Sequence, residues 1–161
     1  MASSWIERHL RKVDNEFRTP LSEIEAGEKT GHWMWWIFPQ AKGLGTSATA
    51  KEFAIESLEE AVACLAHPPF GDRYCQMVGA VWSQVVKNGT AVKTLFPFSP
   101  DDRKLVSSLT LFRRAAEHLT QLQRPEPDRR AFSLLIDQST EILERAQGEN
   151  LGPCSLSQGL E

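Results

Sequence analysis

KTGHWMWWIFPQAKGLGTS, residues 29–47, is the most aromatic stretch of this 161-residue chain, and we interpret the rest of the chain as the scaffold that holds it. Three of the five Trp residues fall within it, namely Trp33, Trp35 and Trp36. Glycines and a proline flank these rings and allow the backbone to turn sharply at both ends. Large rigid side chains in such a place predict either the wall of a pocket or a plug in the core. The run is too short for its periodicity to separate a strand from a helical turn. Because no convincing second strand accompanies it, we predict a short helical or irregular segment.

Helical periodicity surrounds this stretch on both sides. Apolar residues recur at spacings of three and four, which is typical of amphipathic helices. The expected helices cover about residues 4–18, 20–26, 48–55, 58–66, 71–87, 101–119 and 128–146. Their ends carry ordinary signals, among them Ser57 with Glu60 as a capping box, a break at 67–69, and Asn88-Gly89 as a stop. The sequence therefore predicts an all-α fold, a single compact domain of about six to seven helices with a Trp-rich irregular segment. It should cover residues 1–147, and residues 148–161 should form a disordered tail.

Composition narrows the classes of function. The chain is 41% hydrophobic and 24% charged, as expected of one globular domain. A formal charge of −3 provides no basic surface for nucleic acid, so we expect no nucleic-acid partner. No apolar run is long enough to cross a membrane and the first residues lack a secretory signal, so a soluble cytoplasmic protein is expected. The cysteines are odd in number and have no C-x-x-C spacing, which predicts reduced thiols rather than disulfides or zinc ligands.

Several sequence motifs follow one another along the chain. HWMWWIFPQ (32–40) is followed by GLG (43–45), FAIESLEEA (53–61), GDR (71–73) and DDRKLVSSLTLF (101–112). Over residues 17–112 this pattern resembles the family called domain of unknown function 1810, whose members are sometimes labelled calpastatin-like. The resemblance implies a compact, mainly α-helical fold without an assigned activity. The calpastatin label does not suit a chain without repeats, since calpastatin inhibits calpain through extended disordered repeats. Phe17 stands where many members have Tyr, and Pro69 where Leu is usual, so a phenolic hydroxyl is absent at the first position.

The Trp run and the glycine turn that follows it suggest a binding site. A turn that leads into a helix N-terminus presents free backbone N–H groups, which can hold a phosphate, and aromatic rings stack on bases. We therefore predict that the chain binds an unknown small molecule, either phosphorylated or nucleotide-like. The candidate ligand-binding residues are Lys29, Trp33, Trp35, Trp36, Gln40, Gly43, Gly45, Ser47, Arg73 and Lys104. Neither a P-loop nor a Rossmann fingerprint is present, and the glycines could instead serve only to let the chain turn.

Catalysis is a separate question, because no residue set forms a recognisable catalytic signature. His32 is the candidate catalytic residue, since imidazole titrates near neutral pH and a Trp wall would exclude water around it. Either His32 or an acid such as Glu28 could assist hydrolysis of an N-glycosidic bond. The alternative is a histidine that is hydrogen-bonded within a turn. The four His residues show no metal-ligand spacing, so neither a metal nor a cofactor is expected.

Two other interpretations of the aromatic segment stay open. It could be the partner-binding surface of a non-catalytic protein-interaction module, since exposed aromatic patches often mark interfaces. It could also be plain core. The sequence is compatible with a monomer or a homodimer.

Overall fold

The predicted all-α fold class is confirmed by the computed structural model, which describes residues 2–152 without the side chains of 2–5 and 13–15. Six helices in this range have eight or more residues, in agreement with the predicted six to seven. They are α1 (Ala2–Glu16), α2 (Arg18–Glu25), α5 (Leu58–Ala66), α6 (Pro68–Trp82), α8 (Asp101–Thr120) and α9 (Glu126–Gly148). Three short helices and one π-helical turn complete the described chain: α3 (Met34–Ile37), α4 (Ala48–Glu52), α7 (Val92–Leu95) and η1 (Ser83–Lys87).

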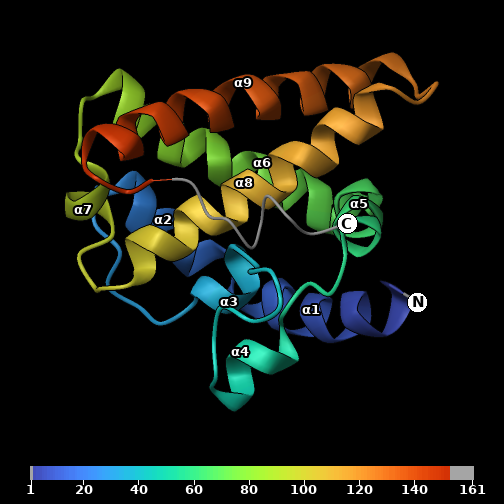
Figure 1. Ribbon diagram of the computed structural model, residues 1–161, viewed down its shortest axis with the longest axis horizontal. Helices are drawn as coiled ribbons and strands as arrows, with labels where there is room; N and C mark the ends of the chain where they lie inside the picture. The colour runs from blue at the N-terminus through green and yellow to red at the C-terminus, as the bar shows by residue number, and fades with distance from the viewer. Residues whose placement is uncertain (1, 153–161) are drawn as a thin grey trace.

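Helix α8 runs through the middle of the molecule, with α9 along one side and α1, α3 and α4 on the other (Figure 1). Small and hydroxyl-bearing residues on α8 are buried and allow its neighbours to approach closely. The Tyr74 hydroxyl of α6 lies 3.0 Å from Ser108 Oγ, and Thr110 Oγ1 donates a hydrogen bond to the Val106 carbonyl at 2.7 Å. Each of these buried hydroxyls therefore has a partner, as a central helix requires.

The boundary between α5 and α6 shows how local chemistry places the helices. Ser57 Oγ accepts from the Glu60 amide at 3.0 Å, as predicted, but the Glu60 carboxylate accepts from the Glu56 amide rather than from that of Ser57. Helix α5 ends at Ala66, as predicted from the two prolines that follow it. Pro68 also opens α6, so this helix begins earlier than the predicted residue 71. Proline suits the first turn of a helix because its φ is already helical and its missing N–H is not needed there.

The segment after the Trp run departs from the prediction. Helix α4 ends at Glu52, whereas the sequence suggested a helix that includes Ile55. Ile55 instead pairs with Ala41 in a parallel bridge, in which the Ile55 amide donates to the Gln40 carbonyl at 2.7 Å and the Lys42 amide donates to the Ile55 carbonyl at 2.8 Å. This pairing closes residues 41–55 into a loop that carries the glycine turn and α4.

The start of the predicted tail belongs to the fold. The Glu149 carboxylate accepts hydrogen bonds from the amides of Val92 and Lys93, at 2.7 and 3.0 Å, and so caps the start of α7. Leu151 is only 4% exposed. The remainder of the predicted tail, residues 153–161, lies outside the described residues. Within the described range, no helix has the length and apolar character needed to cross a membrane.

Candidate functional site

The Trp run forms α3 and the residue before it, as the expected short helical segment. Its three indoles face different surroundings. Trp33 and Trp36 are 3% and 7% exposed, while Trp35 is only half-buried. The ring of Trp33 lies 6.4 Å from those of Phe38 and Phe96 in the core. The predicted wall of three indoles is therefore mainly one indole, that of Trp35.

Glu23 of α2 fixes the loop that enters α3. One of its carboxylate oxygens accepts from the amides of Thr30 and Gly31, both at 2.7 Å, and from the Trp33 indole at 3.0 Å. Burial would raise the pKa of Glu23, but these hydrogen bonds outweigh it and leave the pKa below its ordinary value. Trp33 is thus held by a structural contact, which occupies its one polar atom.

Lys29 is also occupied by the fold. Its side chain is 1% exposed, and Nζ lies 2.7 Å from Asp101 Oδ2 and bonds to the Gly31 carbonyl. The same nitrogen stands 5.0 Å from the centre of the Trp33 ring. Lys29 therefore links the loop before α3 to the start of α8, and as a ligand-binding candidate it is buried and already paired.

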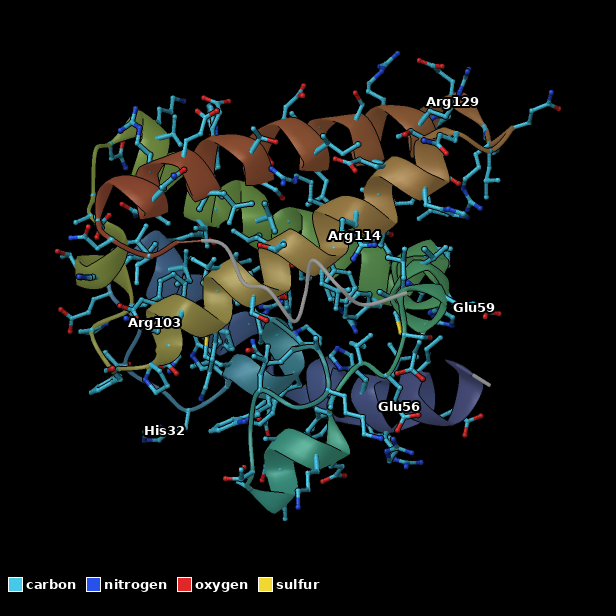
Figure 2. All side chains as sticks on the ribbon, in the orientation of Figure 1. His32, Glu56, Glu59, Arg103, Arg114 and Arg129 are labelled. Carbon is cyan, nitrogen blue, oxygen red and sulfur yellow. The ribbon has the colours of Figure 1, made fainter. Side chains whose placement is uncertain are left out.

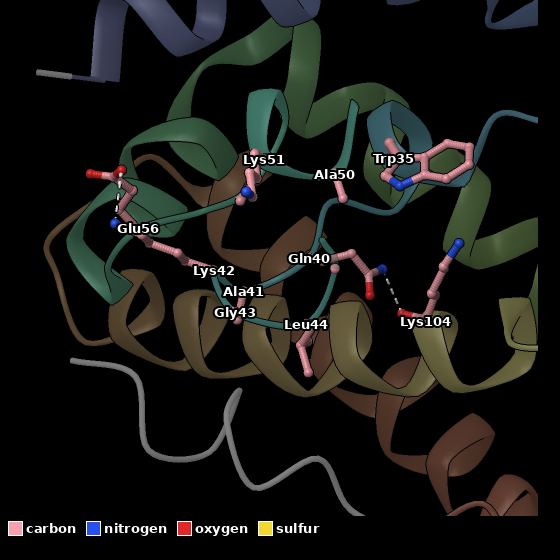
Figure 3. A pocket seen from close by; sticks show the side chains of 12 residues that line it. Trp35, Gln40, Ala41, Lys42, Gly43, Leu44, Ala50, Lys51, Glu56 and Lys104 are labelled. Carbon is pink, nitrogen blue, oxygen red and sulfur yellow. Dashed lines mark hydrogen bonds and ion pairs between the residues drawn. The ribbon is translucent and has the colours of Figure 1, made fainter. Parts of the chain in front are cut away.

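A hollow of about 70 Å³ lies between Trp35, the glycine turn and Lys104 (Figure 3). Its lining residues are Trp35, Gln40, Ala41, Lys42, Gly43, Leu44, Gly45, Ala50, Lys51, Ala54, Glu56 and Lys104. The Gln40 amide nitrogen donates to the carbonyls of Phe38 and Lys104, at 2.8 and 2.9 Å, and so joins the turn to α8. Lys104 Nζ stands 4.3 Å from the centre of the Trp35 ring. The structure therefore brings together five of the ten predicted ligand-binding residues, namely Trp35, Gln40, Gly43, Gly45 and Lys104.

Ser47 has a local role. Its Oγ accepts from the Ala50 amide at 3.1 Å, which is the predicted cap of α4. Because α4 has only five residues and one of its first amides is satisfied by this cap, its N-terminus offers less to an anion than the sequence suggested.

A wider open groove of about 570 Å³ also borders Trp35. Its lining residues are Arg8, Arg11, Lys12, His32, Trp35, Trp36, Thr49, Glu52 and Phe53. Lys12 Nζ stands 4.9 Å from the centre of the Trp36 ring, and Arg8 Nη2 lies 3.4 Å from the Glu52 carbonyl oxygen. His32 is exposed on the outside of the molecule (Figure 2). The candidate catalytic histidine thus belongs to the groove, whereas the glycine turn belongs to the hollow.

The three cations of α1 were missed as site residues. Arg8, Arg11 and Lys12 stand three and four positions apart, so they project from one face of a helix. This spacing was the available signal. Nothing in the sequence, however, placed that face beside Trp35, because the contact joins segments more than twenty positions apart along the chain.

Arg73, the remaining candidate, lies elsewhere. It lines a void of about 10 Å³ together with His9, Phe17 and Tyr74, and its guanidinium carbon is 5.9 Å from the centre of the Phe17 ring. Burial, with a smaller effect from Arg73, lowers the pKa of His9 to about 3. Arg73 is therefore not brought together with Lys104.

Other reactive groups give no second site within the described residues. Burial raises the pKa of the Cys64 thiol and raises that of Cys75 to about 12, so neither is an activated nucleophile. No group of three or more His, Cys, Asp or Glu side chains gathers in that part of the chain as a metal site would require.

Comparison with known proteins agrees with this architecture. A family model described as "Protein of unknown function (DUF1810)" matches residues 3–125. The chain belongs to this family. The DUF1810 match includes every residue that lines the hollow and the groove, and it ends just before α9.

A solved structure is similar as well. It is the crystal structure of the conserved hypothetical protein Rv1873 from Mycobacterium tuberculosis at 1.38 Å, with a TM-score of 0.68 and 35% sequence identity. The similarity covers 91% of this DUF1810 chain and 95% of that one. No match is found among curated proteins.

Proposed function

We propose that this chain binds a small anionic molecule, a phosphorylated or nucleotide-like compound, whose flat ring lies against Trp35. The observation that carries the proposal is the concentration of positive charge around this indole. The two spaces that border Trp35 are lined by six cationic side chains and two carboxylates. They are Arg8, Arg11, Lys12, Lys42, Lys51 and Lys104, with Glu52 and Glu56. The whole chain carries a formal charge of −3, so this local excess of positive charge is opposite in sign to the net charge of the chain.

The contacts of Trp35 fit a ligand of this kind. An indole that is half-buried presents an apolar face for stacking, and clefts lined by one sign of charge raise the local concentration of ions of the other sign. Lys104 already stands over the Trp35 ring, with Nζ 3.6 Å from Asp101 Oδ1. Asp101 is bonded more closely to Lys29, at 2.7 Å, so Lys104 keeps charge available for a phosphate.

The proposal concerns binding. His32 lines the groove, but Glu28, the predicted acid, is exposed and belongs to the lining of neither space. Hydrolysis thus has weaker support than binding. The alternative of a protein-interaction module is also less supported, because burial of Trp33 and Trp36 removes two of the three indoles that such a surface would use.

Isothermal titration calorimetry with adenosine 5′-monophosphate tests the proposal. Wild-type protein should bind, and Trp35→Leu should weaken binding about tenfold or more, because stacking on an aromatic ring is worth about 1–3 kcal/mol per base. Trp82→Phe is the matched control, since Trp82 is also half-buried but its indole contacts Glu141 of α9. Equal affinities for wild type and Trp35→Leu would show that Trp35 is not the binding surface. Absence of binding to wild type would refute the proposal.

A further inference from the structure

We infer that the ligand carries two separate anionic groups, one held in the hollow and one in the groove, with Trp35 between them. This inference rests on the proposed function and specifies the ligand class as compounds with two phosphate groups at separate positions. It follows from how the two spaces are placed, from their separate cations and from their sizes.

Helix α4 and Trp35 form the partition between the two spaces. Thr49 and Glu52 of α4 line the groove, whereas Ala50 and Lys51 line the hollow. Neighbouring residues of a helix point in different directions, so the two spaces lie on different faces of α4. Trp35 borders both, so this residue belongs to the walls of the two spaces.

Each space has its own cations, which come from different parts of the chain. The hollow has Lys42, Lys51 and Lys104, of which Lys51 has no ion-pair partner among the described residues. The groove has the cations of α1, of which Lys12 stands over Trp36 while its ion pair with Glu16 is exposed and therefore weak. Two separate sets of cations favour two anionic groups over one.

The volumes of the two spaces indicate which part of the ligand each can hold. The hollow, at about 70 Å³, has room for a single small group such as a phosphate. The groove, at about 570 Å³, falls within the usual range of pockets for whole small molecules and can take a nucleoside with its own phosphate.

One residue that lines the groove, Trp36, also has a buried polar atom without a partner among the described residues. The indole N–H of Trp36 is buried and has no acceptor in the described part of the chain. A buried donor of this kind normally has an acceptor, such as a ligand oxygen or a water molecule.

The test compares adenosine 5′-monophosphate with adenosine 3′,5′-bisphosphate by calorimetry. Two charge-removing variants, Lys51→Gln in the hollow and Lys12→Gln in the groove, are measured beside Lys87→Gln, an exposed lysine of η1 that lines neither space. All three lysines are exposed, so the variants should fold, which far-UV circular dichroism checks. The bisphosphate should bind wild type about tenfold more tightly than the monophosphate, because a further charge-assisted contact is worth about 1.5 kcal/mol or more.

The two site variants should each lose most of this advantage, and Lys87→Gln should keep it. If the bisphosphate binds no more tightly than the monophosphate, or if only one site variant weakens it, the ligand has one anionic group and the inference is wrong while the proposed function stands. If neither compound binds to wild type, both proposals fail.

Discussion

Acidification should destabilise this fold through His9, which lies in α1 and lines the small void beside Arg73. The side chain is 1% exposed, and its ring meets those of Phe70 and Phe53 edge-on, with centroids 4.9 and 6.3 Å apart. Burial first, and the nearby charge of Arg73 second, lower the pKa of His9 from 6.5 to about 3. The folded protein therefore holds His9 neutral over a pH range in which the unfolded chain binds a proton.

The sign and size of the effect follow from this difference. Because the folded pKa is the lower one, the stabilisation is complete above pH 6.5 and is lost as the pH falls toward 3. At pH 5, which is about 1.5 pH units below the ordinary pKa, His9 is protonated in the unfolded chain and neutral in the folded chain. At about 1.4 kcal/mol per unit, the free energy of unfolding should fall by about 2 kcal/mol between pH 7.5 and 5.

Urea denaturation at the two pH values, followed by Trp fluorescence, measures this difference. His9→Phe should remove the pH-dependent loss, because Phe can keep the edge-on ring contacts but cannot bind a proton. His118→Gln, at an exposed position of α8, should leave the loss unchanged. Glu23, whose pKa is also lowered, acts with the same sign but mainly below the ordinary carboxyl pKa of 4.5. If wild type and His9→Phe lose equal stability between pH 7.5 and 5, then His9 is not buried as a neutral group and the reasoning is refuted.

Three further changes test the scaffold. Gly71→Ala should lower the free energy of unfolding by about 2 kcal/mol or more in chemical denaturation, because the added Cβ would overlap a backbone carbonyl oxygen of α5. Gly79→Ala, on the same helix, is the control: its added Cβ meets only ordinary contacts, so the change should be neutral or slightly stabilising. Lys29→Met should lower the free energy of unfolding by about 3 kcal/mol in the same assay, since it leaves the buried charge of Asp101 largely uncompensated. A loss below about 1 kcal/mol would contradict the buried ion pair. Glu149→Ala should lower the free energy of unfolding by about 1 kcal/mol and speed hydrogen exchange of the two amides that open α7. Unchanged exchange would show that the cap is dispensable.

Much of the fold could be predicted from the sequence because its signals are local. Capping at Ser57, the apolar stripe of α8 and the stop after Lys87 each depend on neighbours a few positions away. The predicted helix ends are less accurate where a distant segment competes for the backbone hydrogen bonds of the last turn. Ile55 leaves the helix because the backbone groups of Gln40 and Lys42 provide its hydrogen-bond partners, and this pairing cannot be predicted from the local pattern.

The candidate site could be predicted only in part, for the same physical reason. The sequence indicated that Trp35 and the glycine turn lie near each other, since only a few residues separate them. It could not indicate that Trp33 is held by Glu23 or that Lys29 is buried against Asp101, because these facts depend on how the loop before α3 packs against α2 and against the start of α8. The cations of α1 were missed for lack of any local link to the Trp run.

The proposed binding surface is assembled from segments that are far apart along the chain: α1, α3, the loop from 41 to 55, and α8. An unfolded chain therefore has no such surface, and a compound that occupies it can bind only the native state. At a concentration one hundred times its dissociation constant, such a compound would add about 2.7 kcal/mol to the native state. Melting temperature thus becomes a way to find the natural ligand of this chain among mixed metabolites without an assay for any reaction.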